Sequence, residues 1–520
     1  MIRKLAHRCH PEVRAVLSAA VALALFLLVA PAAQAQIKLN KISTDTFTNS
    51  SSQHATEVEP DTFSFGSTIV ATFQMGRFPP DGGGPQGLTY GGSSDNGFAT
   101  STDGGSTWTH GVLPGLTTSQ HKGNPYDRVS DPSVAYDPKH AVWLIASLPI
   151  LDSGNDIPAV VVNRSTDGGK TWSKPVSVTG DVDSSDKSWI VCDTWSNSPY
   201  YGNCYVEWDD PYQGDLIYMN TSTDGGKTWG QSLNTGDGAY GLGGQPVVQP
   251  DGTVVVPIEG GYGQMAFYSK NGGSSWSSTV TIANVNDHAE AGGLRSSPLP
   301  SAAVDGNGKV YVVWQDCSFR SGCAENDIVM STSTDGKKWS AVARIPIDPK
   351  SSTVDHFIPG IDADKTTSGK TAHLALTYYF YPQTNCDVDT CRLGVGYVSS
   401  TDGGASWTAA KTLASGMHLG WLPNSQNGLM VADYISTSYV NGKAFGVFAV
   451  AQAPTGSKFH QAMYTTASGL EAPEGGVRFS SAGDQPVPNA KSDHPPRLEE
   501  NERGGRKPPS AKLARKAARQ

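Results

Sequence analysis

One short motif recurs six times along this 520-residue chain, and it constrains the fold more than any other feature. Its clearest copies read Ser-Thr-Asp-Gly-Gly-Lys-Thr-Trp. The acidic or amide position falls at Asp103, Asp167, Asp224, Asn271, Asp335 and Asp402, at spacings of 47 to 67 residues. A repeat of this period is typical of one supersecondary unit used several times. We therefore expect a repeated structural unit.

The chemistry of the motif is that of a tight turn. Its Ser and Asp side chains can accept hydrogen bonds from turn N–H groups, its glycines permit positive φ, and its Trp can pack beneath the turn. The motif resembles the Asp-box, or BNR, repeat of bacterial secreted sialidase-like β-propellers, over nearly all of residues 37–467. The resemblance implies a propeller whose Asp-boxes are structural and lie away from the active face.

Each motif is preceded by further short apolar runs that we interpret as strands. Around the second copy, the runs are residues 131–137, 142–147, 159–163 and 175–178, with the Asp-box between the third and the fourth. Short β-rich runs separated by turns at this spacing indicate four strands per unit.

Counting the first strands of these units gives one unit more than counting Asp-boxes. They begin near Glu59, Asp131, Asp186, Gln245, Leu299, Ile358 and Asp433. The last unit lacks an Asp-box and a fourth strand, and residues 37–43 resemble such a strand. The N-terminal strand would then complete the last unit and remove exposed edges. We predict an all-β, seven-bladed β-propeller over residues 36–467, with a six-bladed sialidase-type propeller as the alternative.

The two ends of the chain have the character of a leader and a tail. Residues 1–35 combine basic residues, a 14-residue apolar run and an Ala-Gln-Ala site, which predicts a cleaved signal peptide and a secreted, periplasmic or extracellular protein. Residues 468–520 lose strand patterning, which predicts a disordered basic tail. The intervening residues 36–502 carry a net charge of −19, which disfavours nucleic acid as a partner. No other run is long enough to span a membrane.

Six cysteines remain after the predicted leader, and an even number in an exported protein favours disulfides. Their spacing suggests three local bridges: Cys192–Cys204, Cys317–Cys323 and Cys386–Cys391. A zinc site would need paired Cys-x-x-Cys motifs and nearby histidines, which the sequence lacks.

Carboxylates recur at the start of the predicted innermost strands. We expect Glu59, Asp131, Asp186 and Asp433 to converge at one channel mouth opposite the Asp-boxes, with Glu259 facing the same side. Such a cluster could share protons, bind a cation, or supply acid and base to a glycoside. The alternative is that each side chain caps a turn and meets water in a wet channel.

The sialidase resemblance also implies three arginines that grip a substrate carboxylate, a Tyr–Glu pair and an acidic residue. Arg77, in an Arg-Phe-Pro sequence, and Arg128 and Arg295, in loops before first strands, are the candidates. Glu290 precedes Arg295 by five residues, and Tyr434 follows Asp433.

These features lead to two functional hypotheses. The first is a secreted, sialidase-like glycoside hydrolase that uses carboxylates at the channel mouth. The second is a non-catalytic propeller that binds glycan or protein through long loops such as residues 75–98, with tyrosines such as Tyr212 and Tyr381 stacking on sugars. We expect a monomer with a glycan or glycoprotein partner and no cofactor, calcium being the alternative.

Overall fold

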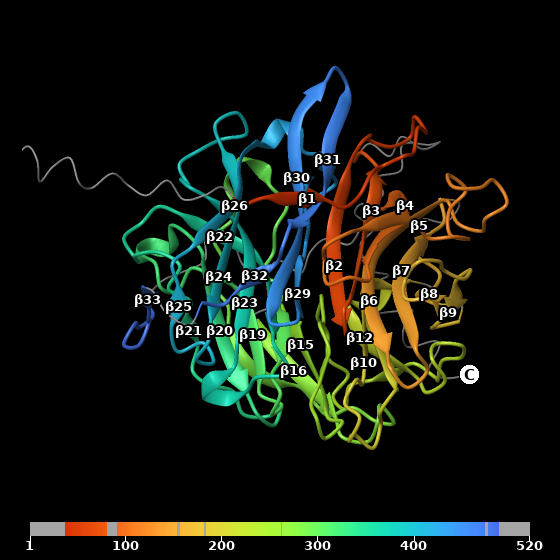
Figure 1. The fold of residues 1–520 in the computed structure, drawn as a ribbon, viewed down its shortest axis with the longest axis horizontal. Helices are drawn as coiled ribbons and strands as arrows, with labels where there is room; N and C mark the ends of the chain where they lie inside the picture. Colours follow the sequence, from red (N-terminus) through yellow and green to blue (C-terminus); the bar gives the residue numbers. More distant parts are fainter. Residues whose placement is uncertain are drawn as a thin grey trace, which may run out of the picture. The chain divides into compact units, whose positions relative to one another are not determined.

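The computed structural model describes residues 37–80, 91–152, 157–180, 182, 184–261, 263–473 and 477–487. Within them the regular structure is almost entirely β-strand, so the protein is all-β as expected (Figure 1). The exceptions are five 3-10 turns at Pro211–Gln213, Ala291–Gly293, Ser321–Cys323, Gly369–Thr371 and Leu419–Trp421. The predicted signal peptide and the last 33 residues of the predicted tail lie outside the described residues.

The strands form antiparallel runs of four, in which each strand pairs with the next. The first run is β2 (Glu57–Phe65), β3 (Thr68–Arg77), β4 (Ser93–Ser101) and β5 (Thr109–Val112). The second is β6 (Arg128–Asp137), β7 (Val142–Ile150), β8 (Val161–Ser165) and β9 (Val176–Ser177). A single pair, Ser93 with Val129, joins these two runs into one eight-stranded sheet.

The next four runs are separate sheets. They are β10 (Asp186–Cys192), β11 (Cys204–Asp210), β12 (Leu216–Ser222) and β13 (Leu233–Asn234); then β14 (Val247–Val248), β15 (Val254–Glu259), β16 (Gly263–Ser269) and β17 (Val280–Asn284). They continue with β18 (Ser301–Val304), β19 (Val310–Asp316), β20 (Asp327–Ser333) and β21 (Ala343–Arg344); then β22 (Asp355–Ala363), β23 (Leu374–Tyr381), β24 (Arg392–Ser400) and β26 (Lys411–His418).

The last run joins the two ends of the described chain. It contains β29 (Ser436–Val440), β30 (Lys443–Thr455), β31 (Lys458–Thr466) and the N-terminal β1 (Leu39–Lys41), which pairs with β31 (Figure 1). This pairing agrees with the prediction for residues 37–43. Two further strands, β32 (Leu470–Glu471) and β33 (Arg478–Phe479), lie beyond residue 467, within the predicted tail. They pair with β30 and with β25 (Trp407–Thr408), respectively.

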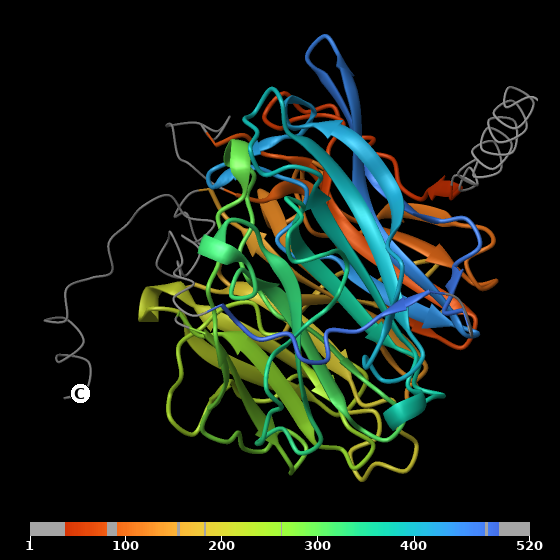
Figure 2. The ribbon, with the colours of Figure 1, turned by 90° about the vertical axis from the view of Figure 1, so that its left-hand side faces the viewer.

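The first strands of the runs surround one central space. None of the sheets in the described part closes on itself, but β2, β6, β10, β14, β18, β22 and β29 contact one another in cyclic order, with β29 returning to β2 (Figures 1 and 2). A cavity of about 620 Å³ is lined by residues from all seven strands. The start of each first strand therefore lies at one end of this space.

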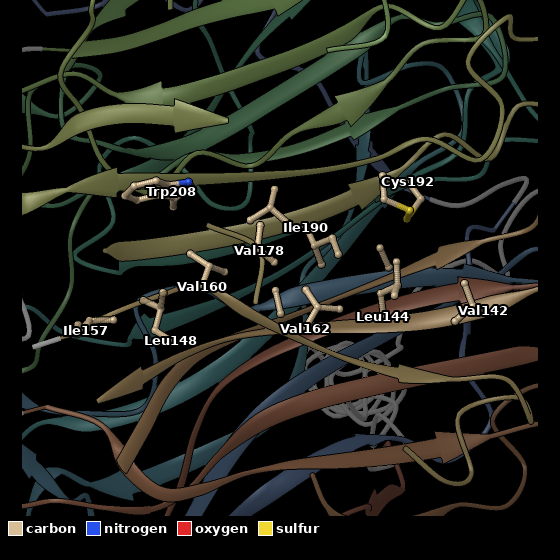
Figure 3. Close-up of a cluster of buried hydrophobic side chains, with 14 of the residues drawn as sticks. Val142, Leu144, Leu148, Ile157, Val160, Val162, Val178, Ile190, Cys192 and Trp208 are labelled. Carbon is tan, nitrogen blue, oxygen red and sulfur yellow. A yellow bond between two sulfur atoms is a disulfide. The ribbon is translucent and has the colours of Figure 1, made fainter. Parts of the chain in front are cut away.

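The core lies between neighbouring runs. In Figure 3, Leu144 of β7 and Val162 of β8 face Ile190 of β10, and all three are fully or almost fully buried. All nine residues of β7 are buried, which explains why its sequence is apolar at every position except Ser147 rather than alternating between apolar and polar residues. Removing one such side chain, as in Ile190→Ala, should cost about 2–5 kcal/mol because a cavity would remain.

The Asp-boxes form the turns that the sequence predicted. In the first copy, Asp103 Oδ1 accepts hydrogen bonds from Ser101 Oγ at 2.8 Å and from Thr107 N at 2.9 Å. Bonds from the Thr107 side chain and backbone lower the pKa of Asp103 to about 2. Gly105 has φ +86°, and a Cβ atom there would lie 2.3 Å from the ring of Phe445, so glycine is required.

The three predicted disulfides are confirmed. Cys192–Cys204 joins β10 to β11, Cys317–Cys323 closes the turn after β19, and Cys386–Cys391 closes the loop between β23 and β24. All three bridges therefore lie within single four-stranded runs.

Candidate functional site

Four first strands begin with the same distortion. β2, β6, β10 and β22 each contain a register shift near the start, and each has one non-glycine residue there with φ between 43° and 53°. These residues are Glu59, Asp131, Lys187 and Ile358. A β-bulge re-aims the side chain of the extra residue, so these positions are equivalent.

In β10 the bulged residue lies one position later than the sequence alignment predicted. The position expected for Asp186 is held by Lys187, one residue later. Asp186 instead pairs with Asp209 of β11, whose pKa is raised well above its usual value by burial and then by the charge of Asp186. Glu259 lies at the end of β15, where its carboxylate accepts a hydrogen bond from Gly261 N at 3.0 Å.

Asp433, in the loop before β29, is held by two cations. Arg295 binds it through both carboxylate oxygens, with Nε 2.6 Å from Oδ1, and Lys187 Nζ also donates to it. Burial alone would raise the pKa of Asp433, but Arg295 and Lys187 outweigh burial and hold this pKa well below its usual value. Asp433 is therefore ionised at neutral pH.

The pKa of Glu59 is shifted in the opposite direction from that of Asp433. Its side chain is fully buried and accepts a hydrogen bond from Gln74 Nε2. Burial, followed by the charges of Asp433 and Asp131, raises the pKa of Glu59 well above its usual value. A hydrogen bond between Glu59 and Asp433 also lowers the pKa of Asp433. The pair thus places a proton-holding carboxyl group beside an ionised one.

A polar network extends from Glu59 to Asp131. Gln74 Nε2 also donates to Ser130 Oγ at 3.2 Å, and Ser130 Oγ donates to Asp131 Oδ1 at 2.5 Å. Arg77 Nη1 donates to Gln74 Oε1 at 2.9 Å. Lys187 Nζ is 4.0 Å from Asp131 Oδ2. Residues from the first three runs and from the loops before β18 and β29 are therefore joined in one group, which we call the Glu59 cluster: Glu59, Gln74, Arg77, Asp131, Lys187, Arg295 and Asp433.

Tyr434 adjoins this cluster. Its ring meets Trp189 edge to face at 4.9 Å, and its hydroxyl donates to the Pro132 carbonyl at 3.3 Å. Burial and then the charges of Glu59 and Asp131 raise the pKa of Tyr434 well above its usual value. The phenol is therefore neutral at physiological pH.

A small hairpin covers the cluster. It consists of β27 (Asn424–Ser425) and β28 (Gly428–Leu429), which we call the hairpin 424–429. Gln426 Oε1 accepts a bond from Arg77 Nη2 at 3.4 Å, and the Leu429 carbonyl accepts one from Arg295 N at 2.8 Å. Gln53 fixes its outer end through two hydrogen bonds with the backbone of Asn424, at 2.8 and 3.0 Å.

The three candidate arginines are buried and engaged with protein groups. Arg77 binds Gln74, Arg295 binds Asp433, and Arg128 lies 2.7 Å from Asp152 Oδ1. The grip on a substrate carboxylate that the sialidase resemblance implied would need these guanidinium groups to face a ligand.

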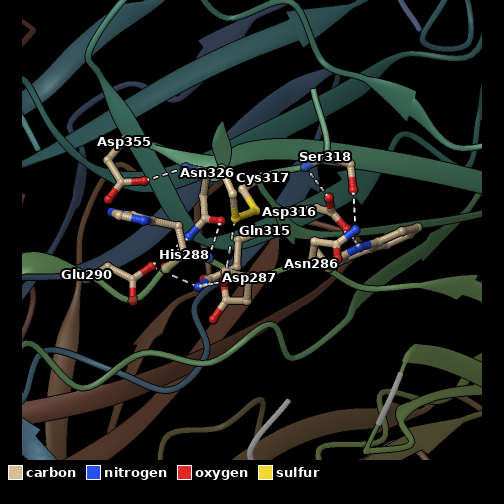
Figure 4. The surroundings of a disulfide bond; sticks show 12 residues. Asn286, Asp287, His288, Glu290, Gln315, Asp316, Cys317, Ser318, Asn326 and Asp355 are labelled. Atoms are coloured by element: carbon tan, nitrogen blue, oxygen red, sulfur yellow. Dashed lines mark hydrogen bonds between the residues drawn. A yellow bond between two sulfur atoms is a disulfide. The ribbon is translucent and has the colours of Figure 1, made fainter. Parts of the chain in front are cut away.

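A second group of buried carboxyls lies beside the Cys317–Cys323 disulfide (Figure 4). Glu290 accepts bonds from Gln315 at 2.8 Å and Asn326 at 3.2 Å. Burial is the main cause that raises the pKa of Asp287 to about 7 and of Asp355 to about 8. Of these three carboxyl residues, only Glu290 could be chosen from the sequence, because Asp287 and Asp355 lie in a loop and a strand that carry no motif.

One further group has the geometry of a cation site. Ligand atoms of Asp327, Asp348 and His356 lie within 4.8 Å of one another. Arg320 and Arg344 form ion pairs with both aspartates at 2.6 to 2.9 Å. Because these arginines already compensate the two carboxylates, the group does not favour a metal ion.

Comparison with known proteins agrees with the repeated Asp-box motif. The family model of the BNR repeat-like domain matches residues 200–439, which include four of the six Asp-boxes. Residues 200–439 of the chain are therefore similar to a BNR repeat-like domain. A sialidase from Bacteroides fragilis (strain YCH46) is 38% identical over 112 residues, which are 18% of this chain and 20% of that relative. The match thus spans about a fifth of the length of the curated relative.

Solved structures similar to this chain have low sequence identity. A protein of unknown function from Dyadobacter fermentans is 17% identical, with a TM-score of 0.44 over 70% of this chain and 99% of that one. An ulvan lyase is 11% identical, with a TM-score of 0.48 over 86% and 100%. The NanB sialidase from Streptococcus pneumoniae is 14% identical, with a TM-score of 0.41 over 83% and 71%. In the described part of the chain, no helix is long and apolar enough to cross a membrane.

Proposed function

We propose that this protein is a carbohydrate-active enzyme, a glycoside hydrolase, built on a seven-bladed β-propeller. Each four-stranded run would be one blade, and the N-terminal β1 would close the last blade. The cyclic contacts between the first strands and the cavity that all of them line support this architecture. A six-bladed ring would leave one of the seven runs without a place.

The observation that carries the proposal is the pair formed by Glu59 and Asp433. Two carboxyl groups whose pKa values are pushed apart are the arrangement that acid–base catalysis needs. Glu59 would act as the general acid and give its proton to the glycosidic oxygen as the bond to the anomeric carbon breaks. Water supplies the hydroxyl group to that carbon, and its other proton returns to Glu59. Asp131 would stabilise the positive charge that develops on the sugar ring.

The substrate would be neutral at the cleaved sugar. A sialic acid would bring a carboxylate into a group that already contains Asp131 and Asp433, and Arg295 is taken up by Asp433 through both of its oxygens. A neutral sugar has no such requirement for a free guanidinium group. The activity of the Bacteroides relative is therefore not carried over to this chain.

Substrate access would require the hairpin 424–429 to move. The Glu59 side chain has 0% exposure, and the hairpin contacts Arg77 and Arg295. Its outer attachment through Gln53 consists of two hydrogen bonds at the exposed surface, which water can replace at low cost.

We also place the protein outside the reducing cytoplasm. Three local disulfides persist where the environment is oxidising, and they fit the predicted leader at residues 1–35.

The test is a panel of chromogenic neutral glycosides and one sialoside, with the wild-type protein and two variants. Glu59→Gln removes the proton donor, and Glu471→Gln makes the same chemical change on an exposed side chain. Hydrolysis of a neutral glycoside that falls at least 100-fold in Glu59→Gln and is unchanged in Glu471→Gln would support the proposal. Binding of a glycan without turnover would favour the non-catalytic alternative. Cleavage of the sialoside alone would overturn the substrate assignment.

A further inference from the structure

The cavity at the centre of the first strands extends to the side of the molecule opposite the Glu59 cluster. Glu59 lies at the start of β2, whereas the cavity is lined by the later part of that strand and by the turn at Gly66. This turn contacts an Asp-box, because the Ser67 carbonyl accepts a bond from Gly104 N at 2.9 Å. Thr366 and Gly442, which also line the cavity, are exposed. The cavity therefore opens on the Asp-box side.

The lining combines aromatic rings with polar groups. Phe63 and Trp195 present their rings to Lys365, whose Nζ lies 5.3 Å and 5.6 Å from the two ring centroids. Two carboxylates also line the cavity. Asp362 lies in β22, and Asp364 lies in the turn directly after that strand. A cavity of about 620 Å³ falls within the usual range of ligand pockets, about 300–1,000 Å³.

Lys365 leaves hydrogen-bonding capacity for a ligand. Among the residues that the structure describes, no hydrogen bond joins its ammonium group to a protein acceptor. The group is held by the two rings and by its charge interactions with Asp362 and Asp193. Its three donors can therefore bind an acceptor on a ligand.

We propose that this cavity is a second ligand site, separate from the Glu59 cluster, which binds a neutral mono- or disaccharide. A sugar hydroxyl both accepts and donates hydrogen bonds, so it can accept from Lys365 and donate to the carboxylates of Asp362 and Asp364. The apolar face of the sugar ring packs against Trp195 and Phe63. A cationic ligand would be repelled by Lys365, and an anionic ligand by the two aspartates.

The test measures the binding of cellobiose, lactose and maltose by calorimetry and by ligand-observed NMR. Lys365→Met removes the donors but keeps the apolar stem, and Thr366→Trp narrows the opening. Their matched controls are Lys337→Met, which removes another lysine that lies over an aromatic ring, 5.0 Å from Tyr268, and Thr412→Trp on the exposed face of β26. Circular dichroism establishes that each variant is folded.

The proposal expects that at least one disaccharide binds and that both cavity variants weaken its binding at least tenfold, while both controls bind as the wild type does. Glu59→Gln should also bind normally, because it lies at the other end of the strands. Binding that survives both cavity variants would overturn the proposal, as would the absence of binding to the folded wild type. Hydrolysis is not part of the readout, so the result is independent of the proposed catalytic function.

Discussion

Asp433 shows how strongly single residues depend on their partners in this protein. Its carboxylate, Arg295 and Lys187 are all at least 96% buried, so each charge is compensated by the others rather than by water. Removing one member of a buried charged group leaves an uncompensated charge, which costs more than the original interaction gained. Glu59 is the one neighbour that can respond, because it can release its proton.

We expect Asp433→Asn to lower the free energy of unfolding by about 3 kcal/mol, because Arg295 and Lys187 lose their counter-charge. Ionisation of Glu59 should offset part of this cost. In a Glu59→Gln background that response is absent, so the same substitution should cost more. Chemical denaturation of both single variants and the double variant measures the difference. Additive effects would contradict the coupling, and Asp389→Asn, on an exposed loop, is the control.

Several residues of the Glu59 cluster could be chosen from the sequence because the repeated units can be aligned with one another. Glu59, Asp131 and Asp433 could be chosen because each lies at or just before the start of a repeated strand. Lys187 was missed because the bulge in β10 shifts the equivalent position by one residue from Asp186. The ion pair between Arg295 and Asp433 joins residues 138 positions apart, and no local pattern signals it.

At the scale of single elements, the Asp-box turn repeats the same hydrogen bonds with small variations. Asp402 Oδ1 accepts from Ser400 Oγ at 2.7 Å and from Ser406 N at 2.8 Å. In the fourth copy, Asn271 makes the corresponding bonds from Ser269 and Ser275 at 2.9 and 3.0 Å. The acceptor oxygen, rather than the charge, is therefore what the turn requires.

This comparison predicts different effects for two substitutions. Asp402→Ala should lower the free energy of unfolding by about 1–2 kcal/mol, because Ser400 and Ser406 lose their acceptor. Asp402→Asn should cost clearly less, because the chain already uses Asn271 in the same role. Thermal unfolding of the two variants shows whether the turn requires the acceptor oxygen or the negative charge. Equal losses would indicate that the charge matters.

The strands and turns were largely predictable because the Asp-box marks the same point in successive units. The part of the fold that could least be predicted was its C-terminal end, where β32 and β33 follow residue 467 without an Asp-box or an alternating pattern. Their pairing depends on partners far back in the chain, such as Trp407 with Phe479.

At the scale of the whole molecule, many buried carboxyl groups titrate above their usual range. Burial is the largest cause that raises the pKa of Glu57, Asp95 and Asp355 to about 8 and of Asp61 to about 7. In the unfolded chain these groups would titrate near pH 4. The folded state therefore binds more protons between pH 5 and 8, so its stability falls as the pH rises.

We expect a lower melting temperature at pH 8 than at pH 5. Glu57→Gln should reduce this difference, because the amide stays neutral while its oxygen can still accept the bonds from Ser43 and Met463. Calorimetry at a series of pH values measures both effects. A melting temperature that rises between pH 5 and 8 would contradict the assignment of these carboxyls as proton-bearing groups.

The pairing of β1 with β31 gives a second prediction at this scale. A chain that starts at residue 44 loses this pairing and the buried side chain of Ile42, and it exposes the edge of β31. We expect a lower melting temperature and self-association, compared with a chain that starts at residue 36. Calorimetry and size-exclusion chromatography measure the two effects. A truncated chain that melts like the longer one would contradict the role of β1 in closing the fold.

The same pairing sets an order of events during biosynthesis. β1 is among the first folded segments to leave the ribosome, and its partner follows more than 400 residues later. At about 5–20 residues per second, β1 waits at least about 20 seconds for β31. During that interval the earlier runs can form, but their circle of contacts remains unfinished. A nascent chain is thus kept from completing this circle of contacts until β31 has been made.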